Sequence, residues 1–173
     1  HFFDGFRTSH ELNTVELLDD EVLERLIDKE SVLKFRLRAL NINHPEEHGT
    51  NENEDIYFQS VEARNKDYEA IPEIVEFYMD KINEVQKTDY KPFNYYGVDN
   101  AKYVIVSMGS VSSTIKSVVE DLNKNGHSVG CIEVHLYRPF SKKHILDVLP
   151  KSTRRIAVLD RTKESGSIGE PLY

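Results

Sequence analysis

The stretch Tyr103-Val104-Ile105-Val106-Ser107-Met108-Gly109-Ser110 decides the fold. Its first six residues are almost continuously apolar, as in a strand of a parallel sheet that is covered on both faces. The Gly-Ser pair then leads into a segment with apolar residues at helical spacing, which are Ile115, Val118, Val119 and Leu122. A strand that turns into an amphipathic helix is the first half of a βαβ unit.

The same order of elements continues along the chain. Gly126 is expected to end the first helix, and residues 129–136 form a second apolar run. Ser141 can cap a further helix that Pro150 stops, and residues 155–159 form a third apolar run. Two consecutive βαβ units predict three parallel strands. The expected fold class is therefore α/β, a three-layer α/β/α architecture with a mostly parallel sheet. Because three strands are few, we expect further strands outside this chain.

The first third of the chain predicts helices followed by an irregular stretch. Apolar residues recur at three- and four-residue steps over 18–27, which indicates a helix. Ser31 could cap a second helix that runs to Leu40. Residues 41–68 are rich in Asn, Pro and Gly, and we expect them to form an irregular strap with a short apolar anchor at Ile56-Tyr57-Phe58.

A longer helix is predicted next. Residues 69–87 carry one broad apolar face, and Pro72 is compatible with the first helical turn, where its missing N–H is not needed. Residues 91–97 are expected to connect this helix to the sheet. The helices and irregular stretch together form a linker before the α/β domain.

Composition and charge bound the class of protein. The chain has 173 residues, 39% of them hydrophobic and 30% charged, which predicts one globular domain or a domain with an appendage. No apolar run is long enough to cross a membrane. Residues 1–90 carry a net charge of −12 and residues 91–173 carry +4. The acidic half argues against general nucleic-acid binding, and the basic half could face an anionic cofactor or an acidic neighbour.

The single cysteine excludes several kinds of site. Cys131 cannot form a disulfide within this chain, and it cannot hold an iron–sulfur cluster alone. It sits in an apolar run, which favours a packing role over a nucleophilic one. Cysteine usage fits a reducing cytosol, so we expect a cytoplasmic location. Because the chain starts at His1 rather than Met, we expect a piece of a longer protein.

Three residues that could bind an anion lie where predicted strands end. Ser110 stands at a predicted helix start, where backbone N–H groups can bind a phosphate, although serine there often only caps the helix. Arg161 follows Asp160 at the exit of the third strand, and Arg138 follows the second strand. Each arginine can bind an anion or brace a neighbouring loop. We expect a weak cofactor contact at Ser110 and Arg161, and we assign no catalytic residue.

Two other constellations are weaker. His44 and His48 are four residues apart, but Pro45 and Gly49 break the helix that this spacing needs, so we expect no metal site there. Asp4, Ser9 and His10 offer the residue types of a Ser–His–acid triad, but adjacency in sequence is not triad geometry. We therefore interpret residues 4–11 as a buried polar network at a domain junction.

The residues resemble a known family in several blocks. The segment from Asp160 to Glu164, followed by Gly-Glu-Pro-Leu-Tyr at 169–173, is similar to a signature of pyruvate:ferredoxin/flavodoxin oxidoreductases. The blocks at 1–11, 55–65 and 104–110, and the run Leu-Tyr-Arg-Pro-Phe at 136–140, resemble the same family in the same order. Some positions depart from its pattern, which leaves open a paralogue that acts on another 2-oxo acid, or a non-catalytic interaction module of a diverged complex.

The resemblance implies the function of a larger protein. It implies an enzyme that oxidatively decarboxylates pyruvate with thiamine diphosphate and Mg²⁺, passes electrons through [4Fe–4S] clusters to ferredoxin or flavodoxin, and transfers acetyl to coenzyme A. Its partners would be other domains of the same polypeptide and a second copy in a homodimer. The Ser110 and Arg161 contact would then be with coenzyme A.

The resemblance also implies a division of this chain. Residues 1–16 would end a preceding domain, residues 17–96 would be the linker, and residues 97–173 would begin a domain that resembles the C-terminal domain of transketolase. None of the cofactors is expected to bind to this segment alone. We therefore expect its role to be structural, in the packing of domains.

Overall fold

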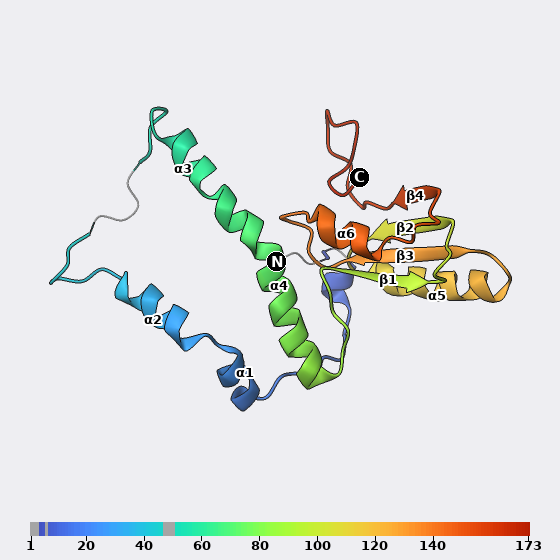
Figure 1. Ribbon diagram of the computed structural model, residues 1–173, viewed down its shortest axis with the longest axis horizontal. Coiled ribbons are helices and arrows are strands. Elements are labelled where there is room, and N and C mark those ends of the chain that lie inside the picture. The colour runs from blue at the N-terminus through green and yellow to red at the C-terminus, as the bar shows by residue number, and fades with distance from the viewer. Residues whose placement is uncertain (1–3, 6, 47–50) are drawn as a thin grey trace. The chain divides into compact units, whose positions relative to one another are not determined.

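The computed structural model describes residues 4–5, 7–46 and 51–173 (Figure 1). They belong to two compact units. The sheet unit is Ala70–Tyr173 together with His1–Leu12, and the helical unit is Asn13–Glu69. Each unit is described below by itself.

The sheet unit contains a four-stranded mixed sheet. Its strands are β1 (Phe93–Gly97), β2 (Tyr103–Ser107), β3 (Val129–Val134) and β4 (Arg155–Val158), in the order β1-β3-β2-β4. The last three in sequence are mutually parallel, and β1 runs antiparallel to β3. The predicted α/β fold with a mostly parallel sheet is confirmed.

Strand β1 corrects the expectation that residues 91–97 only connect elements. Phe93 is 1% exposed and lies opposite Val134 of β3. The polar residue beside it hid the pattern, because Asn94 is also buried. Its side chain donates to the Asp89 carbonyl at 2.6 Å and accepts from the Lys91 N–H at 2.8 Å. A buried amide with satisfied hydrogen bonds is tolerated in a core, but it resembles a turn residue in the sequence.

Helices cover both faces of the sheet and create three layers. Helices α5 (Val111–Lys124) and α6 (Lys142–Val148) lie on opposite sides of it in Figure 1. Successive strand residues point to opposite faces, so the unit has two apolar clusters. One cluster contains Phe93, Val104, Val106, Ile132 and Val134, with Ile145 of α6 packed against it. The other contains Ile115, Val119 and Cys131.

Helix α4 (Asn65–Gln86) confirms the predicted helix over 69–87 and starts earlier. Pro72 therefore lies inside the helix, and the expectation that it occupies the first turn is wrong. The expected irregular stretch 41–68 is also wrong in its last part, because α3 (Tyr57–Ala63) lies there. The apolar anchor, Ile56-Tyr57-Phe58, is exposed. Among the helices that the structure describes, none is long and apolar enough to span a membrane.

The helical unit begins with two short helices. Helix α1 (Asp20–Leu26) confirms the prediction for 18–27, and α2 (Lys29–Leu37) follows after two residues. The cap of α2 is Asp28 and not the predicted Ser31. The Asp28 carboxylate accepts the N–H groups of Glu30 and Ser31, and the Ser31 hydroxyl donates to it at 2.6 Å. These hydrogen bonds, led by those of Ser31, hold the pKa of Asp28 below its usual value of 3.8.

Candidate functional site

A cavity of about 700 Å³ opens at the carboxyl ends of the parallel strands. Ser110 lines it after β2, Arg161 lines it after β4, and Tyr137 lines it after β3. In open α/β sheets this edge is where ligands and partner segments gather. The structure thus brings together the two residues that the sequence marked as cofactor contacts, although they are 51 positions apart in the sequence.

The polar centre of this cavity is the carboxylate of Asp4. Its Oδ2 accepts a hydrogen bond from the Ser110 backbone N–H at 2.7 Å, and its Oδ1 lies 3.5 Å from Arg161 Nη1. Hydrogen bonds from Ser110, through its side chain and its backbone, together with the charge of Arg161, hold the pKa of Asp4 below its usual 3.8. The N–H of Ser110 at the start of α5 therefore binds an anionic group, and that group is a side chain of the same protein.

Gly109 makes room for this carboxylate. Its backbone φ is +81°, a value that residues other than glycine rarely adopt. A Cβ added at this position would lie 2.8 Å from Asp4 Oδ1. The turn from β2 into α5 therefore needs glycine both for its backbone conformation and for the close approach of Asp4.

The signature segment at the end of the chain is held by its own carboxylates. Asp160 accepts hydrogen bonds from the backbone N–H groups of Leu172 at 3.2 Å and Tyr173 at 3.1 Å. Glu170 accepts the N–H of Glu164 at 3.0 Å and pairs with Lys163 at 2.5 Å. Asp160 and Glu170 thus hold the two ends of this loop together, so both carboxylates stabilise its conformation.

The remaining strand-end residues also make internal contacts. The Arg138 guanidinium lies 4.6 Å from the centre of the Tyr137 ring. The Tyr137 hydroxyl donates to the Pro171 carbonyl at 3.3 Å, which ties the end of β3 to the signature segment. Cys131 is 2% exposed, and burial raises the pKa of its thiol, as its predicted packing role requires.

The polar run at residues 4–11 does not form the expected buried network. Ser9 and His10 are exposed, and Asp4 is directed to Ser110 instead. The residue types of a triad are therefore present without its geometry. His44 is also exposed, and His48 lies outside the described residues. The contact of Asp4 could not be found from sequence, because its partner is 106 positions away.

A second cavity, of about 540 Å³, lies between β1 and α5. Its lysines already have partners. Lys116 pairs with Glu133 at 2.6 Å and lies 3.8 Å from the centre of the Tyr96 ring. Lys124 pairs with Glu120 at 2.7 Å. Arg161 is likewise paired, with Asp4, so the strand-end edge is the stronger candidate only because ligands gather at the carboxyl ends of parallel strands.

Two protein families match the chain. Residues 1–80 match "Pyruvate flavodoxin/ferredoxin oxidoreductase, thiamine diP-bdg", and residues 101–173 match "Pyruvate:ferredoxin oxidoreductase core domain II". The chain belongs to the pyruvate:ferredoxin/flavodoxin oxidoreductase family. The sequence blocks that resembled this family are thereby confirmed.

Curated relatives agree along the whole chain. A pyruvate-flavodoxin oxidoreductase of Enterobacter agglomerans is 54% identical over 100% of this chain and 15% of its own length. A pyruvate:ferredoxin oxidoreductase of Moorella thermoacetica is 51% identical over 100% of this chain and 15% of its own length. The chain therefore spans about 15% of the length of these relatives.

The chain is also similar to a solved structure. It is the 2-oxoglutarate:ferredoxin oxidoreductase from Magnetococcus marinus with 2-oxoglutarate, coenzyme A and succinyl-CoA bound. The match covers 66% of this chain and 18% of that chain, with 19% identity and a TM-score of 0.40.

Residues 1–80 match a family whose description names thiamine diphosphate binding. A cofactor of this size needs a concave site that buries most of its surface. Among the described residues from 4 to 80, Pro72 alone is buried. We therefore assign no step of the thiamine chemistry to these residues.

Proposed function

We propose that this chain is the domain-packing part of a pyruvate:ferredoxin (flavodoxin) oxidoreductase. The observation that carries the proposal is the 54% identity to a pyruvate-flavodoxin oxidoreductase over the whole chain. In this proposal residues 1–16 end one domain, residues 17–96 link, and residues 97–173 begin the domain that resembles the transketolase C-terminal domain. This segment contributes no catalytic residue.

The contacts of Asp4 support the packing role. Asp4 comes from the segment that matches the first family, and its partners Ser110 and Arg161 come from the segment that matches the second. One carboxylate thus links a helix start, an arginine and a chain segment far away in sequence. This arrangement suits a fixed junction more than a site that must release a product.

The activity belongs to the intact protein. It decarboxylates pyruvate, transfers the acetyl group to coenzyme A and passes the electrons to ferredoxin or flavodoxin. Thiamine diphosphate, Mg²⁺ and [4Fe–4S] clusters are held by its other parts. We place the intact protein in the cytoplasm as a homodimer.

Two measurements test this function. The intact protein, supplied with thiamine diphosphate, should reduce a viologen when given pyruvate and coenzyme A. The chain of 173 residues alone should neither reduce viologen nor bind thiamine diphosphate in a calorimeter.

Absence of reduction by the intact protein would refute the activity. Reduction with another 2-oxo acid but not with pyruvate would replace pyruvate as the assigned substrate. Stoichiometric thiamine diphosphate binding by the chain alone would refute the division of roles.

We also propose a weak contact of coenzyme A with Ser110 and Arg161. Its support is that both residues line the 700 Å³ cavity at the strand ends. A phosphate there has to compete with Asp4 for the same two groups. In the intact enzyme, Arg161→Ala should raise the KM for coenzyme A and leave the KM for pyruvate unchanged. An unchanged KM for coenzyme A would eliminate the contact.

A further inference from the structure

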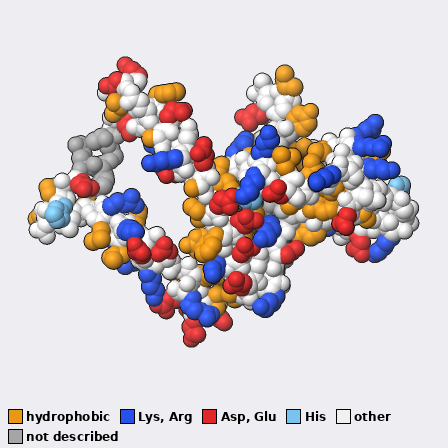
Figure 2. Space-filling model, viewed as in Figure 1, with side chains coloured by type: hydrophobic (Ala, Val, Ile, Leu, Met, Phe, Trp, Pro, Cys, Tyr) orange, Lys and Arg blue, Asp and Glu red, His pale blue; other side chains and the backbone are white. Residues whose placement is uncertain are grey.

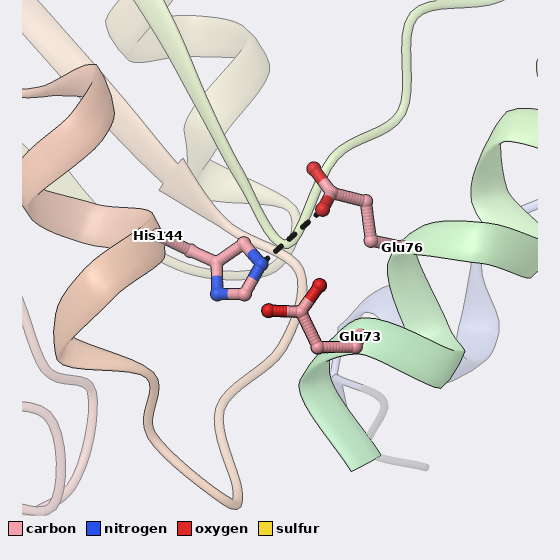
Figure 3. A group of neighbouring side chains, drawn as sticks. All are labelled: Glu73, Glu76 and His144. Atoms are coloured by element: carbon pink, nitrogen blue, oxygen red, sulfur yellow. Dashed lines mark hydrogen bonds and ion pairs between the residues drawn. The ribbon is translucent and has the colours of Figure 1, made fainter. Parts of the chain in front are cut away.

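Three potential metal ligands meet at a place that the proposed function does not use. We propose that Glu73, Glu76 and His144 form a binding site for one zinc ion. Figure 3 shows the two glutamates of α4 and the histidine of α6 with their polar ends toward one another. One ligand atom from each residue lies within 4.8 Å of the others. The proposal is independent of the pyruvate chemistry.

The spacing of these atoms suits a small metal ion. His144 Nε2 lies 3.3 Å from Glu76 Oε2. Two ligands about 2.0–2.1 Å from a tetrahedral zinc ion lie about 3.3–3.4 Å from each other. Glu73 is three residues before Glu76 on the same face of α4, and its exposed side chain can turn toward the same point. Three protein ligands leave the fourth position to water.

The histidine is held in the orientation that a zinc ligand needs. His144 is 7% exposed, and its Nδ1 lies 2.5 Å from the Ser141 hydroxyl oxygen. When Nδ1 donates its proton to Ser141, the lone pair of Nε2 is directed at the glutamates. Histidines that bind metals almost always donate the other ring N–H in this way. Ser141 is therefore a positioning residue for this site.

The lysines around the site compete with the metal without blocking it. Lys143 Nζ lies 2.7 Å from Glu73 Oε1, and Lys91 Nζ lies 3.8 Å from Glu76 Oε1. The Lys143 side chain is 64% exposed, so it can leave the carboxylate for water. Exposed ion pairs contribute little to stability, and a divalent ion can displace this one. Removal of Lys143 should therefore strengthen zinc binding.

The ligand types select the metal. One imidazole and two carboxylates are ligands that zinc accepts. Mg²⁺ and Ca²⁺ prefer sets made of oxygen alone, and imidazole favours transition metals. We therefore expect Zn²⁺ to bind, Co²⁺ to replace it, and Mg²⁺ to leave the site unoccupied.

The experiment is a zinc titration of the chain of 173 residues after treatment with a chelator. Calorimetry should give one zinc per chain, and zinc should raise the unfolding temperature until the chelator is restored. His144→Gln and Glu76→Gln should each weaken binding at least tenfold, and Ser141→Ala should weaken it about 10–100-fold. Lys143→Ala, at an exposed position, should bind zinc more tightly than the wild type.

Matched variants separate this site from surface binding. His127→Gln and Glu69→Gln change an exposed histidine and an exposed glutamate of α4 outside the cluster, and both should bind zinc like the wild type. Equal zinc affinity in the wild type and His144→Gln would overturn the proposal, as would a wild type that shows no saturable binding. Weaker zinc binding by Lys143→Ala would also contradict the proposal, because removal of a lysine that competes with zinc for Glu73 must raise the affinity for zinc.

Discussion

The two units differ in what holds them together. In the sheet unit, Phe93, Val104 and Ile132 are each at most 1% exposed, and they belong to one apolar cluster between the sheet and α6. In the helical unit, none of the described residues in 13–46 and 51–69 is buried. The helical unit has helices with regular local hydrogen bonds, but its described residues form no buried core.

The apolar side chains of the helical unit show what this difference means. Leu33, Phe35 and Leu37 of α2 are 56%, 69% and 72% exposed, and hydrophobic side chains are visible on the surface along this segment (Figure 2). Short helices gain most of their stability from tertiary packing. Since this chain spans about 15% of its relatives, we expect the intact protein to cover these residues. The sheet unit should fold by itself, and the helical unit should depend on that cover.

The largest test of the comparison is one truncation in each unit. Ile132→Ala removes a fully buried side chain and should lower the free energy of unfolding by about 2–5 kcal/mol. Leu33→Ala removes an exposed one and should change it by less than about 0.5 kcal/mol. Urea unfolding of the chain, followed by circular dichroism, measures both. Equal losses would mean that the helical unit has a core of its own.

A second test uses glycines of the sheet unit. Gly97 has φ +138°, and a Cβ there would lie 2.6 Å from the Gly130 Cα. Gly97→Ala should therefore cost at least about 2 kcal/mol, because backbone strain and overpacking each cost about 1–3 kcal/mol. Gly126→Ala is the matched control, since its φ is +85° but no atom lies within 4 Å of the added Cβ. It should cost about 1 kcal/mol. Equal costs would show that the close approach of β1 and β3 is not rigid.

The sequence predicted the elements whose apolar pattern is strong. The runs that became β2 and β3 were found because parallel strands covered on both faces are nearly continuous in hydrophobicity. The run of β4 has the same apolar pattern, although this edge strand is mostly exposed. Helix α5 was found from its one-sided spacing, and Gly126 follows its last turn with the positive φ that ends helices. These features depend on neighbouring residues only.

The elements that were missed depend on distant residues. Strand β1 looked like a connector because Asn94 is polar. The burial of Asn94 is tolerated through hydrogen bonds with Asp89 and Lys91 just before it, and the strand that pairs with β1 is β3, far along the chain. At the candidate site, Ser110 and Arg161 were singled out, but Asp4 was assigned to a separate polar network at residues 4–11. The glutamates of α4 and His144 share no motif, since they are about 70 positions apart. Topology brings such groups together, and no local pattern records it.

Ion pairs give a third and smaller contrast between the units. Lys116 in the sheet unit pairs with Glu133, whose side chain is 17% exposed, while Lys34 in the helical unit pairs with Glu30, whose side chain is 74% exposed. Burial alone would lower the pKa of Lys116, but its bonds to Glu133 and Tyr96 outweigh burial and raise it above 10.5. Its stabilising effect is therefore complete below that pH and is lost as the pH rises further.

Replacement of each lysine by methionine tests this contrast. Lys116→Met removes the ion pair with Glu133, which keeps His135 as a neighbour at 3.4 Å, and it removes the contact with the Tyr96 ring, so it should cost about 1–2 kcal/mol at neutral pH. Lys34→Met should change stability by less than about 0.5 kcal/mol. Urea unfolding at low and high salt measures both variants. A larger loss for Lys34→Met would reverse the assignment of the stronger pair.

The smallest expected effect compares two aspartates at helix starts. Asp4 binds the start of α5 from 106 positions away, and Asp28 caps α2 locally. Asp4→Asn should lower the stability of the sheet unit by less than about 1 kcal/mol at pH 6.

The pKa of Asp4 is lowered, so its stabilising effect is present above pH 3.8 and is lost as the pH falls through the lower folded value. The unfolding temperatures of the wild type and Asp4→Asn should therefore converge as the pH falls below 3.8. Asp28→Asn should leave the unfolding of the sheet unit unchanged at every pH, because Asp28 belongs to the helical unit, none of whose described residues is buried. A difference between the wild type and Asp4→Asn that persists in acid would show that the Asp4 side chain acts through packing and not through its charge.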